Sequence, residues 1–426
     1  MKKKSEISRR DFIKHSAAVS IAAVAQGSSR IFAAGSDKIR VGLIGCGGRG
    51  TNGIQECVQS SKGVELVAMG DLFKDRLDTC LVELKKKIPN NIKVTSETCF
   101  VGFDAYKKVI DSDVDLVLLE TPPHYRPMHL KYAIEKNKHV FMEKPVATDP
   151  VGIRSVIKSS KLAENKGLAI VAGTQRRHQK PYQEIMKRVH NGDIGEIVSG
   201  QCYWLGGVIL GYWQYYEKEG LSDMEWQCRN WGWITWLCGD HIVEQHVHSL
   251  DVMNWAIGSH PVKCIGMGGR EVRNIGNIFD HFAVEYEYPN GVRVSSMCRQ
   301  IGGCTHQVSE RVIGVNGKTY THASGNCYIE GQNAYKYEGE SLNPYVQEHK
   351  DLIAGIREGK VLNEGVRVAE STMTAIMGRM SAYTGRALKW DWAMNASKLD
   401  LSPPEYDFKV DFPMRPVAVP GKTQLV

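Results

Sequence analysis

The sequence predicts an α/β fold in which a parallel β-sheet with helices on both faces precedes a largely antiparallel sheet. From residue 38 to residue 172, short apolar runs typical of buried strands alternate with segments of helical period, which indicates parallel strands joined by crossover helices. After residue 263, strand-like segments rich in Val, Tyr and Phe are separated by hairpin turns at residues 289–291 and 316–317. Helical patterns then follow over residues 345–357 and 365–384.

The N-terminal segment has the pattern of an export signal. Arg9 and Arg10 form a twin-arginine pair that stands directly before a mild apolar stretch at residues 17–25 and small residues at 33–34. We expect residues 1–33 to be a signal peptide recognised by the twin-arginine export machinery, so that the mature protein is periplasmic or otherwise exported. The alternative is a disordered basic tail on a cytoplasmic protein.

The charge and the cysteine content argue against several classes of protein. The formal net charge is +7, of which the first 33 residues carry +5, so the remainder sits near +2. This small positive balance predicts no nucleic-acid partner. Outside the leader no apolar run approaches the ~20 residues of a membrane-spanning helix, so we expect no stable membrane insertion. The 11 cysteines include no C-x-x-C pair and indicate neither a disulfide framework nor a zinc site.

The first predicted strand runs directly into a glycine-rich turn. Residues 45–50 read Gly-Cys-Gly-Gly-Arg-Gly, a G-x-G-x-x-G sequence that opens a helix, and the second strand ends at Asp71. The glycines bring the backbone close to a pyrophosphate at the helix N-terminus, while the carboxylate of Asp71 would bind the adenosine ribose and repel a 2′-phosphate. Residues 36–174 are therefore predicted to be a Rossmann domain that binds NAD, with NADP less favoured. The cofactor contacts expected in this segment are Gly45, Gly47, Gly48, Arg49, Gly50 and Asp71.

Further motifs resemble those of a known family. Thr-Pro-Pro-His at residues 121–124 and Glu-Lys-Pro at residues 143–145 are followed by Gly-Thr-Gln-Arg-Arg at residues 173–177. This succession closely resembles the Gfo/Idh/MocA oxidoreductases from about residue 38 to at least residue 255, and more loosely to about residue 392. The resemblance implies a C-terminal α/β domain, placed at residues 175–392, with an open, largely antiparallel sheet that often mediates dimers or tetramers. We expect a homodimer or homotetramer, and an extended C-terminal arm at residues 393–426.

The resemblance also implies catalytic and cofactor-binding residues. Lys144 would stand beside the nicotinamide and assist proton transfer from a substrate hydroxyl while hydride leaves the carbon. The family's Asp-x-x-x-His signature fits best with Glu244 and His248, whose i, i+4 spacing places both on one helix face. His248 would then act as the general acid/base and Glu244 would orient hydroxyl groups, with Glu in place of the family's Asp. Further cofactor contacts are expected at Thr121, Pro122, His124 and Glu143.

The same segment contains the side chains of a conceivable metal site. His241, Glu244, His246 and His248 have metal-ligand chemistry. However, His246 and His248 are two residues apart and cannot share a helix face, and the resemblance implies no metal, so no metal is predicted. His246 stands where many family members have Gly. His241 and His246 are candidate substrate contacts, with capping or packing as the alternative role for His241.

Aromatic residues crowd the region before this segment. Six of the nine tryptophans lie between Tyr203 and Trp236, interleaved with amide and guanidinium side chains. Such faces suit a carbohydrate, but they suit a hydrophobic core or a dimer interface equally well. Trp231 is the substrate contact predicted in this cluster. Arg176 and Arg177, at the expected domain junction, are further candidate substrate contacts, with a solvated basic loop as the alternative.

These patterns predict an NAD-dependent oxidoreductase that moves hydride between tightly bound NAD and a hydroxyl-bearing carbon of a sugar or sugar derivative. Because soluble NAD is scarce outside the cytoplasm, an exported enzyme would carry its cofactor and return the hydride in a closed cycle. The alternatives are a redox-assisted glycoside hydrolase, an enzyme that forms 3-keto-glycosides, and a non-enzymatic sugar sensor. The resemblance implies that related glycosidases lack the Glu-Lys-Pro lysine, which favours dehydrogenase chemistry. The presence of Lys144, Glu244 and His248 together argues against a sensor.

Overall fold

The structure, a computed structural model, describes residues 38–207 and 215–426. The predicted signal peptide at residues 1–33 lies outside the described residues, as do Tyr212 and Trp213 of the aromatic cluster. None of the described helices is both long and apolar enough to cross a lipid bilayer. The 11 cysteines are free thiols, and nine of them are buried.

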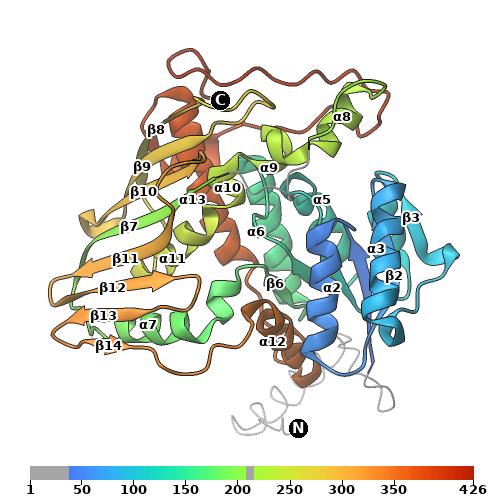
Figure 1. Cartoon of the computed structure of the whole chain (residues 1–426), viewed down its shortest axis with the longest axis horizontal. Coiled ribbons are helices and arrows are strands. Elements are labelled where there is room, and N and C mark those ends of the chain that lie inside the picture. The colour runs from blue at the N-terminus through green and yellow to red at the C-terminus, as the bar shows by residue number, and fades with distance from the viewer. Residues whose placement is uncertain (1–37, 208–214) are drawn as a thin grey trace, which may run out of the picture. The chain divides into compact units, whose positions relative to one another are not determined.

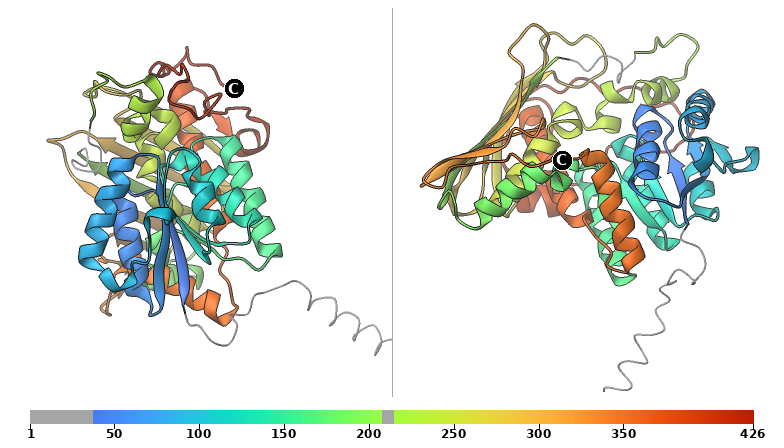
Figure 2. Two further views of the ribbon diagram at one scale, coloured as in Figure 1. Left: turned by 90° about the vertical axis from the view of Figure 1, so that its right-hand side faces the viewer. Right: turned by 60° about the horizontal axis from the view of Figure 1, so that its bottom comes forward.

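In the part of the chain that the structure describes, the first sheet has six strands, all parallel, in the order β3-β2-β1-β4-β5-β6 (Figure 1). Helices α2 and α3 lie on one side of it and α5 and α6 on the other, as the left view of Figure 2 shows in blue and in teal to green. Because helices cover both faces, the central strands are almost entirely buried, which confirms the predicted doubly wound sheet. The elements are β1 (Ile39–Ile44), α2 (Gly48–Ser60), β2 (Val64–Asp71), α3 (Lys74–Lys87), β3 (Cys99–Val101), α4 (Ala105–Asp111), β4 (Leu116–Leu119), α5 (Arg126–Glu135), β5 (His139–Met142), α6 (Pro150–Asn165) and β6 (Ile170–Ala172).

The second sheet, as far as the described residues go, has nine strands in the order β14-β13-β12-β11-β7-β10-β9-β8-β15. All neighbouring strands are antiparallel except β7 and β10, which run parallel. The open, largely antiparallel sheet that we expected is therefore confirmed. Its strands are β7 (Ile197–Gly206), β8 (Lys263–Gly269), β9 (His281–Glu287), β10 (Arg293–Gln300), β11 (Gln307–Gly314), β12 (Gly317–His322), β13 (Tyr328–Gly331), β14 (Tyr335–Lys336) and β15 (Leu388–Lys389).

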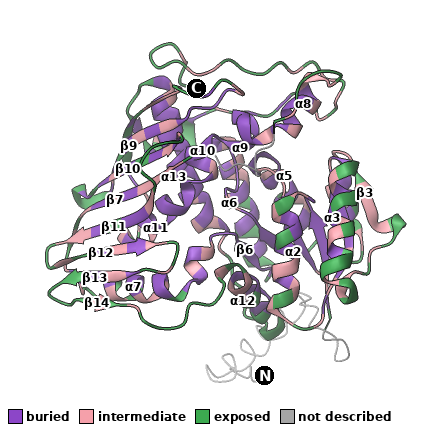
Figure 3. Ribbon diagram, in the orientation of Figure 1, coloured by how far each residue is buried: buried purple, intermediate pink, exposed green. Residues whose placement is uncertain are grey.

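One face of the second sheet packs on helices α11 (Val247–Ile257) and α13 (Gly365–Thr384), and α7 (Lys180–His190) packs on α11. Along β10 every second residue is buried, as the pleat of a one-sided sheet requires. Helix α13 also packs on α6 of the first sheet, so it joins the two sheets through one hydrophobic core. Figure 3 shows this as purple, buried positions running through α13, α10 and α6.

The remaining elements surround the region between the two sheets. Short helices α8 (Asp223–Arg229), α9 (Thr235–Cys238) and α10 (His241–Glu244) precede α11, and α12 (Pro344–Glu358) packs on α2. The helical patterns predicted near the C-terminus correspond to α12 and α13. After a π-helical turn, η7 (Trp392–Ala396), residues 397–426 form neither helix nor strand and appear as the dark-red trace across the top of Figure 1.

Candidate active site

A cavity of about 1010 Å³ runs along the carboxyl ends of the Rossmann strands. Its walls come from the loops after β1, β2, β4 and β5 and from the segments that lie between β7 and α11. In open α/β sheets, ligands bind at this edge, where the strand order reverses between β1 and β4. The structure therefore brings side chains from both halves of the chain to one space.

The glycine-rich loop forms the floor of this cavity. Helix α2 begins at Gly48, its first turn has no side-chain cap, and Gly45, Gly47 and Gly48 line the cavity. The unpaired N–H groups of a helix N-terminus attract anions, so this loop fits a pyrophosphate. Gly45 has φ +99°, and a β-carbon there would lie 2.7 Å from the backbone of Thr121. Only glycine satisfies both requirements at this position.

Gly50 marks the closest approach of α2 to this loop. A β-carbon at Gly50 would lie 1.9 Å from the carbonyl oxygen of Gly45, whereas one at Gly48 would meet no atom within 4 Å. We expect Gly50→Ala to lower the free energy of unfolding by about 3 kcal/mol and to abolish nucleotide retention, because backbone atoms on both sides cannot yield. Gly48→Ala is the matched control and should melt like the wild type. Thermal melting and the nucleotide content of denatured protein test this, and an unchanged Gly50→Ala would contradict it.

Asp71 lies at the end of β2 and lines the cavity. Its carboxylate accepts the backbone N–H of Cys46 at 2.6 Å and that of Phe73 at 2.8 Å, which holds it beside the glycine-rich loop. Burial raises the pKa of Asp71, and the two N–H groups oppose this rise. Arg76 lines the same end of the cavity, and its guanidinium donates to the carbonyl of Arg229 at 3.3 Å.

Lys144 and Glu244 meet in the cavity. Lys144 follows β5, and its Nζ donates to the backbone carbonyl of Glu244 at 2.6 Å and to Oε1 of the same residue at 3.1 Å. Both side chains are 14% exposed, so the pair is largely shielded but open to the cavity. Thr121, Pro122 and Glu143 also line the cavity. These predicted cofactor contacts thus lie between the glycine-rich loop and Lys144.

His248 lies in the first turn of α11 and also lines the cavity. Its ring stacks on Trp204 with the centroids 5.8 Å apart, and Trp231 also lines the cavity. Burial, together with the nearby charges of Lys144 and Arg176, lowers the pKa of His248 well below its ordinary value. The imidazole is therefore neutral near pH 7 and carries one lone pair that can accept a hydrogen bond.

The local helix that we predicted around Glu244 and His248 is wrong. Helix α10 ends at Glu244 and α11 begins at Val247, so the two residues belong to different helices. The i, i+4 spacing therefore does not bring them together on one helix face. They meet because both helix ends reach the same cavity, where they join Lys144.

Arg176 and Arg177 do not line the cavity, so the expectation that they contact substrate is corrected. Arg176 forms a buried ion pair with Glu310, a residue that local sequence patterns did not single out. Arg177 pairs with Asp251 at 2.8 Å. The alternative, a solvated basic loop, does not apply either, because both side chains are largely buried. Each is paired with a carboxylate, which offsets the cost of burying a charge.

His241 and His246 also lie away from the cavity. His246 Nε2 is hydrogen bonded to Ser296 at 2.7 Å under the second sheet, and the His241 ring packs edge-on against Phe282. The expectation that both residues contact substrate is therefore corrected. For His241 the alternative role, packing in the core, agrees with its ring contact. Among residues 38–207 and 215–426, no group of three or more His, Cys, Asp or Glu side chains is arranged to hold a metal ion.

Arg49 lines the cavity, but its guanidinium is bound by carboxylates. Its Nε donates to Glu143 at 2.6 Å, Nη1 pairs with Glu56 at 2.8 Å, and the side chain lies over the ring of Tyr345 on α12. We expect Arg49 to contact the cofactor, but in the structure its guanidinium is paired with Glu143, the residue before Lys144. Glu120 belongs to the same buried cluster, at 3.8 Å from Arg49 Nε.

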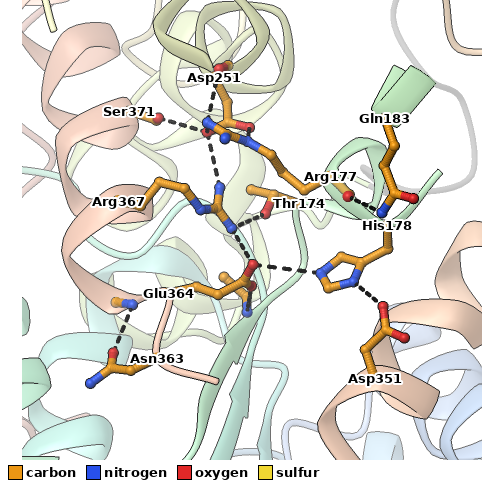
Figure 4. Close-up of polar contacts among 12 residues, drawn as sticks. Thr174, Arg177, His178, Gln183, Asp251, Asp351, Asn363, Glu364, Arg367 and Ser371 are labelled. Atoms are coloured by element: carbon orange, nitrogen blue, oxygen red, sulfur yellow. Dashed lines mark hydrogen bonds and ion pairs between the residues drawn. The ribbon is translucent and has the colours of Figure 1, made fainter. Parts of the chain in front are cut away.

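An ionic cluster fixes the helix that carries His248. Asp251, one turn after His248, accepts N–H groups of Arg177 at 2.8 and 3.0 Å and of Arg367 at 3.1 Å, and the hydroxyl of Ser371 at 2.7 Å. Figure 4 shows Arg177 from the turn after β6, and Arg367 and Ser371 from α13, converging on this carboxylate of α11. Although burial opposes ionisation, the two arginines hold the pKa of Asp251 below its usual range.

The cluster continues toward the Rossmann sheet. Arg367 pairs with Glu364 at 2.6 Å, as Figure 4 shows. Glu364 also accepts the backbone N–H of Ala172 at the end of β6. Burial alone would lower the pKa of His178, but its contacts with Asp351 and Glu364 raise it to about 9. Alternating charges therefore link α11 and α13 to the edge of the first sheet.

Residues 39–174 match the sequence model of the GFO_IDH_MocA family, described as an oxidoreductase family with an NAD-binding Rossmann fold. This segment is therefore similar to the NAD-binding Rossmann domains of that family. The match covers the parallel sheet, the glycine-rich loop and the Glu-Lys-Pro strand end.

The similarity to curated proteins extends beyond this segment. An inositol 2-dehydrogenase from Rhodococcus jostii is 26% identical over 168 residues, which are 39% of this chain and 42% of the relative. A scyllo-inositol 2-dehydrogenase (NAD(+)) from Bacillus subtilis is 22% identical over 290 residues, 66% of this chain and 73% of the relative. The chain thus matches less than half the length of the first of these relatives.

Solved structures show the same two-sheet fold. An NAD binding oxidoreductase from Klebsiella pneumoniae has a TM-score of 0.66 at 16% identity, covering 83% of this chain and 98% of the other. An oxidoreductase from Agrobacterium radiobacter in complex with NAD+, L-tartaric acid and magnesium has a TM-score of 0.63 at 15% identity, covering 83% and 98%. An aldose-aldose oxidoreductase from Caulobacter crescentus has a TM-score of 0.64 at 17% identity, covering 83% and 99%. At these identities the likeness concerns the fold alone.

Proposed function

We propose that this protein is an oxidoreductase that transfers hydride between NAD and a hydroxyl-bearing carbon of a sugar or cyclitol. The observation that carries the proposal is the convergence of Lys144, Glu244 and His248 in the same cavity as an uncapped, glycine-rich helix N-terminus. The curated relatives named as inositol 2-dehydrogenases support a polyhydroxylated substrate.

The residues divide the work of alcohol oxidation. NAD, when bound, supplies the hydride acceptor. Lys144, held by two oxygens of Glu244, can hydrogen bond the substrate oxygen and assist the transfer of its proton. The neutral imidazole of His248 can accept a hydrogen bond from a substrate hydroxyl and so orient it. Trp204 and Trp231 also line the cavity and offer flat apolar faces to the C–H groups of a substrate.

We further propose NAD rather than NADP, held tightly enough to leave the cytoplasm with the folded protein. An ionised Asp71 at the end of β2 would repel a 2′-phosphate, which supports NAD. The twin-arginine pair Arg9 and Arg10 supports export to the periplasm. Exposed Ile265 and Met267 on the outward face of β8 support assembly through the open sheet into a homodimer or homotetramer.

A redox-neutral glycoside hydrolase is the second candidate, with 3-keto-glycoside formation as its partial reaction. Glu244, which lines the same cavity as Lys144, gives a further acid/base group that elimination and water addition would need. The lysine of the Glu-Lys-Pro segment lies in the cavity at the expected reacting end and favours the simple oxidoreductase.

One assay separates these functions. Purified protein is dialysed extensively, and one portion is denatured so that the supernatant can be assayed for nicotinamide nucleotide. Inositols, simple sugars and nitrophenyl glycosides are then titrated into native protein while NADH absorbance and nitrophenol release are recorded. We expect near-stoichiometric NAD that an inositol or sugar reduces. Release of nitrophenol without net NADH would favour the hydrolase, and neither signal with any compound would reject both.

A further inference from the structure

The C-terminal arm, residues 397–426, runs from the second sheet to the Rossmann domain and then returns. On the way out, the backbone N–H of Leu401 donates to Asp149 at the start of α6, at 2.9 Å. On the way back, the backbone N–H of Gly421 donates to the carbonyl of Thr384 at the end of α13, at 3.1 Å. The arm is thus tethered at both ends, and Figure 1 shows its middle part reaching toward α8.

The farthest part of the arm inserts aromatic rings between the loops of the Rossmann domain. The Phe408 ring stacks on Phe73 with centroids 5.8 Å apart and lies 5.0 Å from the ring of Phe103. Tyr406 lines the cavity, and its hydroxyl is hydrogen bonded to Nε2 of His124 at 2.7 Å. Burial lowers the pKa of His124 to about 3, so this ring is neutral and the hydrogen bond persists at physiological pH.

These contacts lie at one identifiable end of the cavity. Phe73 is two residues beyond Asp71, and Phe103 follows β3, the strand next to β2 at the sheet edge. In a dinucleotide-binding sheet the acid after the second strand holds the adenosine ribose, so the adenine ring lies on this side of it. Lys144, by contrast, follows β5 on the other side of the strand-order reversal.

We propose that the tip of the C-terminal arm forms the outer wall of an adenine subsite, with Tyr406 facing the ligand and Phe408 positioning Phe73. This adenine subsite rests on one part of the proposed function, namely that the cavity binds an adenine dinucleotide. Flat aromatic rings with a hydroxyl at one edge suit the faces and edges of adenine. His124, expected to contact the cofactor directly, does not line the cavity and acts through Tyr406 instead.

This arrangement would slow the release of a bound cofactor. The arm forms no helix or strand of its own, but its tip packs on Phe73 and Phe103 while its two ends are hydrogen bonded to α6 and α13. Release of a nucleotide past Tyr406 therefore requires the arm to leave those aromatic contacts. Because the arm must open before the adenine can leave, it would slow dissociation of the cofactor. Slow dissociation would let the protein carry its cofactor through export.

The test uses the full chain, freed of nucleotide, with ADP and nicotinamide mononucleotide as separate probes in titration calorimetry. Tyr406→Ala should bind ADP about fivefold to tenfold more weakly, because it loses one aromatic contact, while its affinity for nicotinamide mononucleotide stays that of the wild type. Phe412→Ala is the matched control, since this ring on the same arm packs on Trp236 at 5.5 Å and does not line the cavity. It should bind ADP like the wild type. Tyr406→Leu keeps the apolar volume and replaces Tyr406→Ala if the latter does not fold.

The outcomes separate the two proposals. If the wild type binds NAD and ADP but the Tyr406 variants bind ADP equally well, the adenine subsite is refuted while the proposed function stands. Equal weakening of ADP and nicotinamide mononucleotide would mean a general loss of structure and would also refute the subsite. If the wild type binds neither ADP nor NAD, the dinucleotide function fails, and the subsite fails with it.

Discussion

Replacing Lys144 with alanine is expected to lower turnover by about 10²- to 10⁴-fold, the range that a positioned proton-transfer group contributes. Two hydrogen bonds to Glu244 hold the Nζ of Lys144 in the cavity. Both of these contacts go to Glu244 rather than to the glycine-rich loop, so nucleotide binding should survive the change. The measurements are the rate of NADH formation with the best substrate and the NAD content of the purified variant.

The control for this prediction is Lys187→Ala. Lys187 is an exposed lysine on α7 and does not line the cavity, so its removal should leave turnover and NAD content at the wild-type level. A Lys144→Ala enzyme with the wild-type rate would refute the assigned role. A variant that lost its NAD as well as its activity would indicate that Lys144 binds the cofactor rather than assisting the reaction.

Replacing Asp251 with alanine is expected to lower the free energy of unfolding by about 3–5 kcal/mol, as the removal of one partner from a buried ion pair does. The Asp251 side chain is 2% exposed and pairs with Arg177 and Arg367. Without it, the largely buried Arg177 would lose its carboxylate partner and Arg367 would keep only Glu364. Because the same carboxylate fixes α11 one turn after His248, activity should fall as well. Urea denaturation and steady-state kinetics on the folded fraction test both effects.

A surface ion pair provides the comparison for Asp251. Glu330 pairs with Lys318 between neighbouring strands, with side chains that are 51% and 56% exposed. Glu330→Ala should therefore change the free energy of unfolding by less than about 1 kcal/mol. If Asp251→Ala proved as mild as Glu330→Ala, the cluster in Figure 4 would not be what holds α11 in place.

The sequence by itself determined the parallel sheet and the floor of the candidate site. The strand, the glycine turn, the helix and the acid at Asp71 lie within a continuous stretch from residue 38 to residue 71, and each follows local rules of backbone geometry and hydrophobic period. The antiparallel character of the second sheet followed in the same way from turn residues between short strands. The placement of Lys144 at a strand end needed only the strand and the Glu-Lys-Pro motif after it.

The tertiary structure alone decided which side chains share the cavity. Glu244 meets Lys144 across 100 positions of sequence, and Tyr406 reaches His124 across 282. Sequence spacing placed Glu244 and His248 on one helix, but one helix ends and another begins between them. The sequence also offered no sign that Arg176 turns inward to pair with Glu310. Local sequence reports the conformation that a few neighbouring residues prefer. A buried ion pair or an aromatic strap depends on the shape and charge of surfaces that are assembled only when distant segments pack.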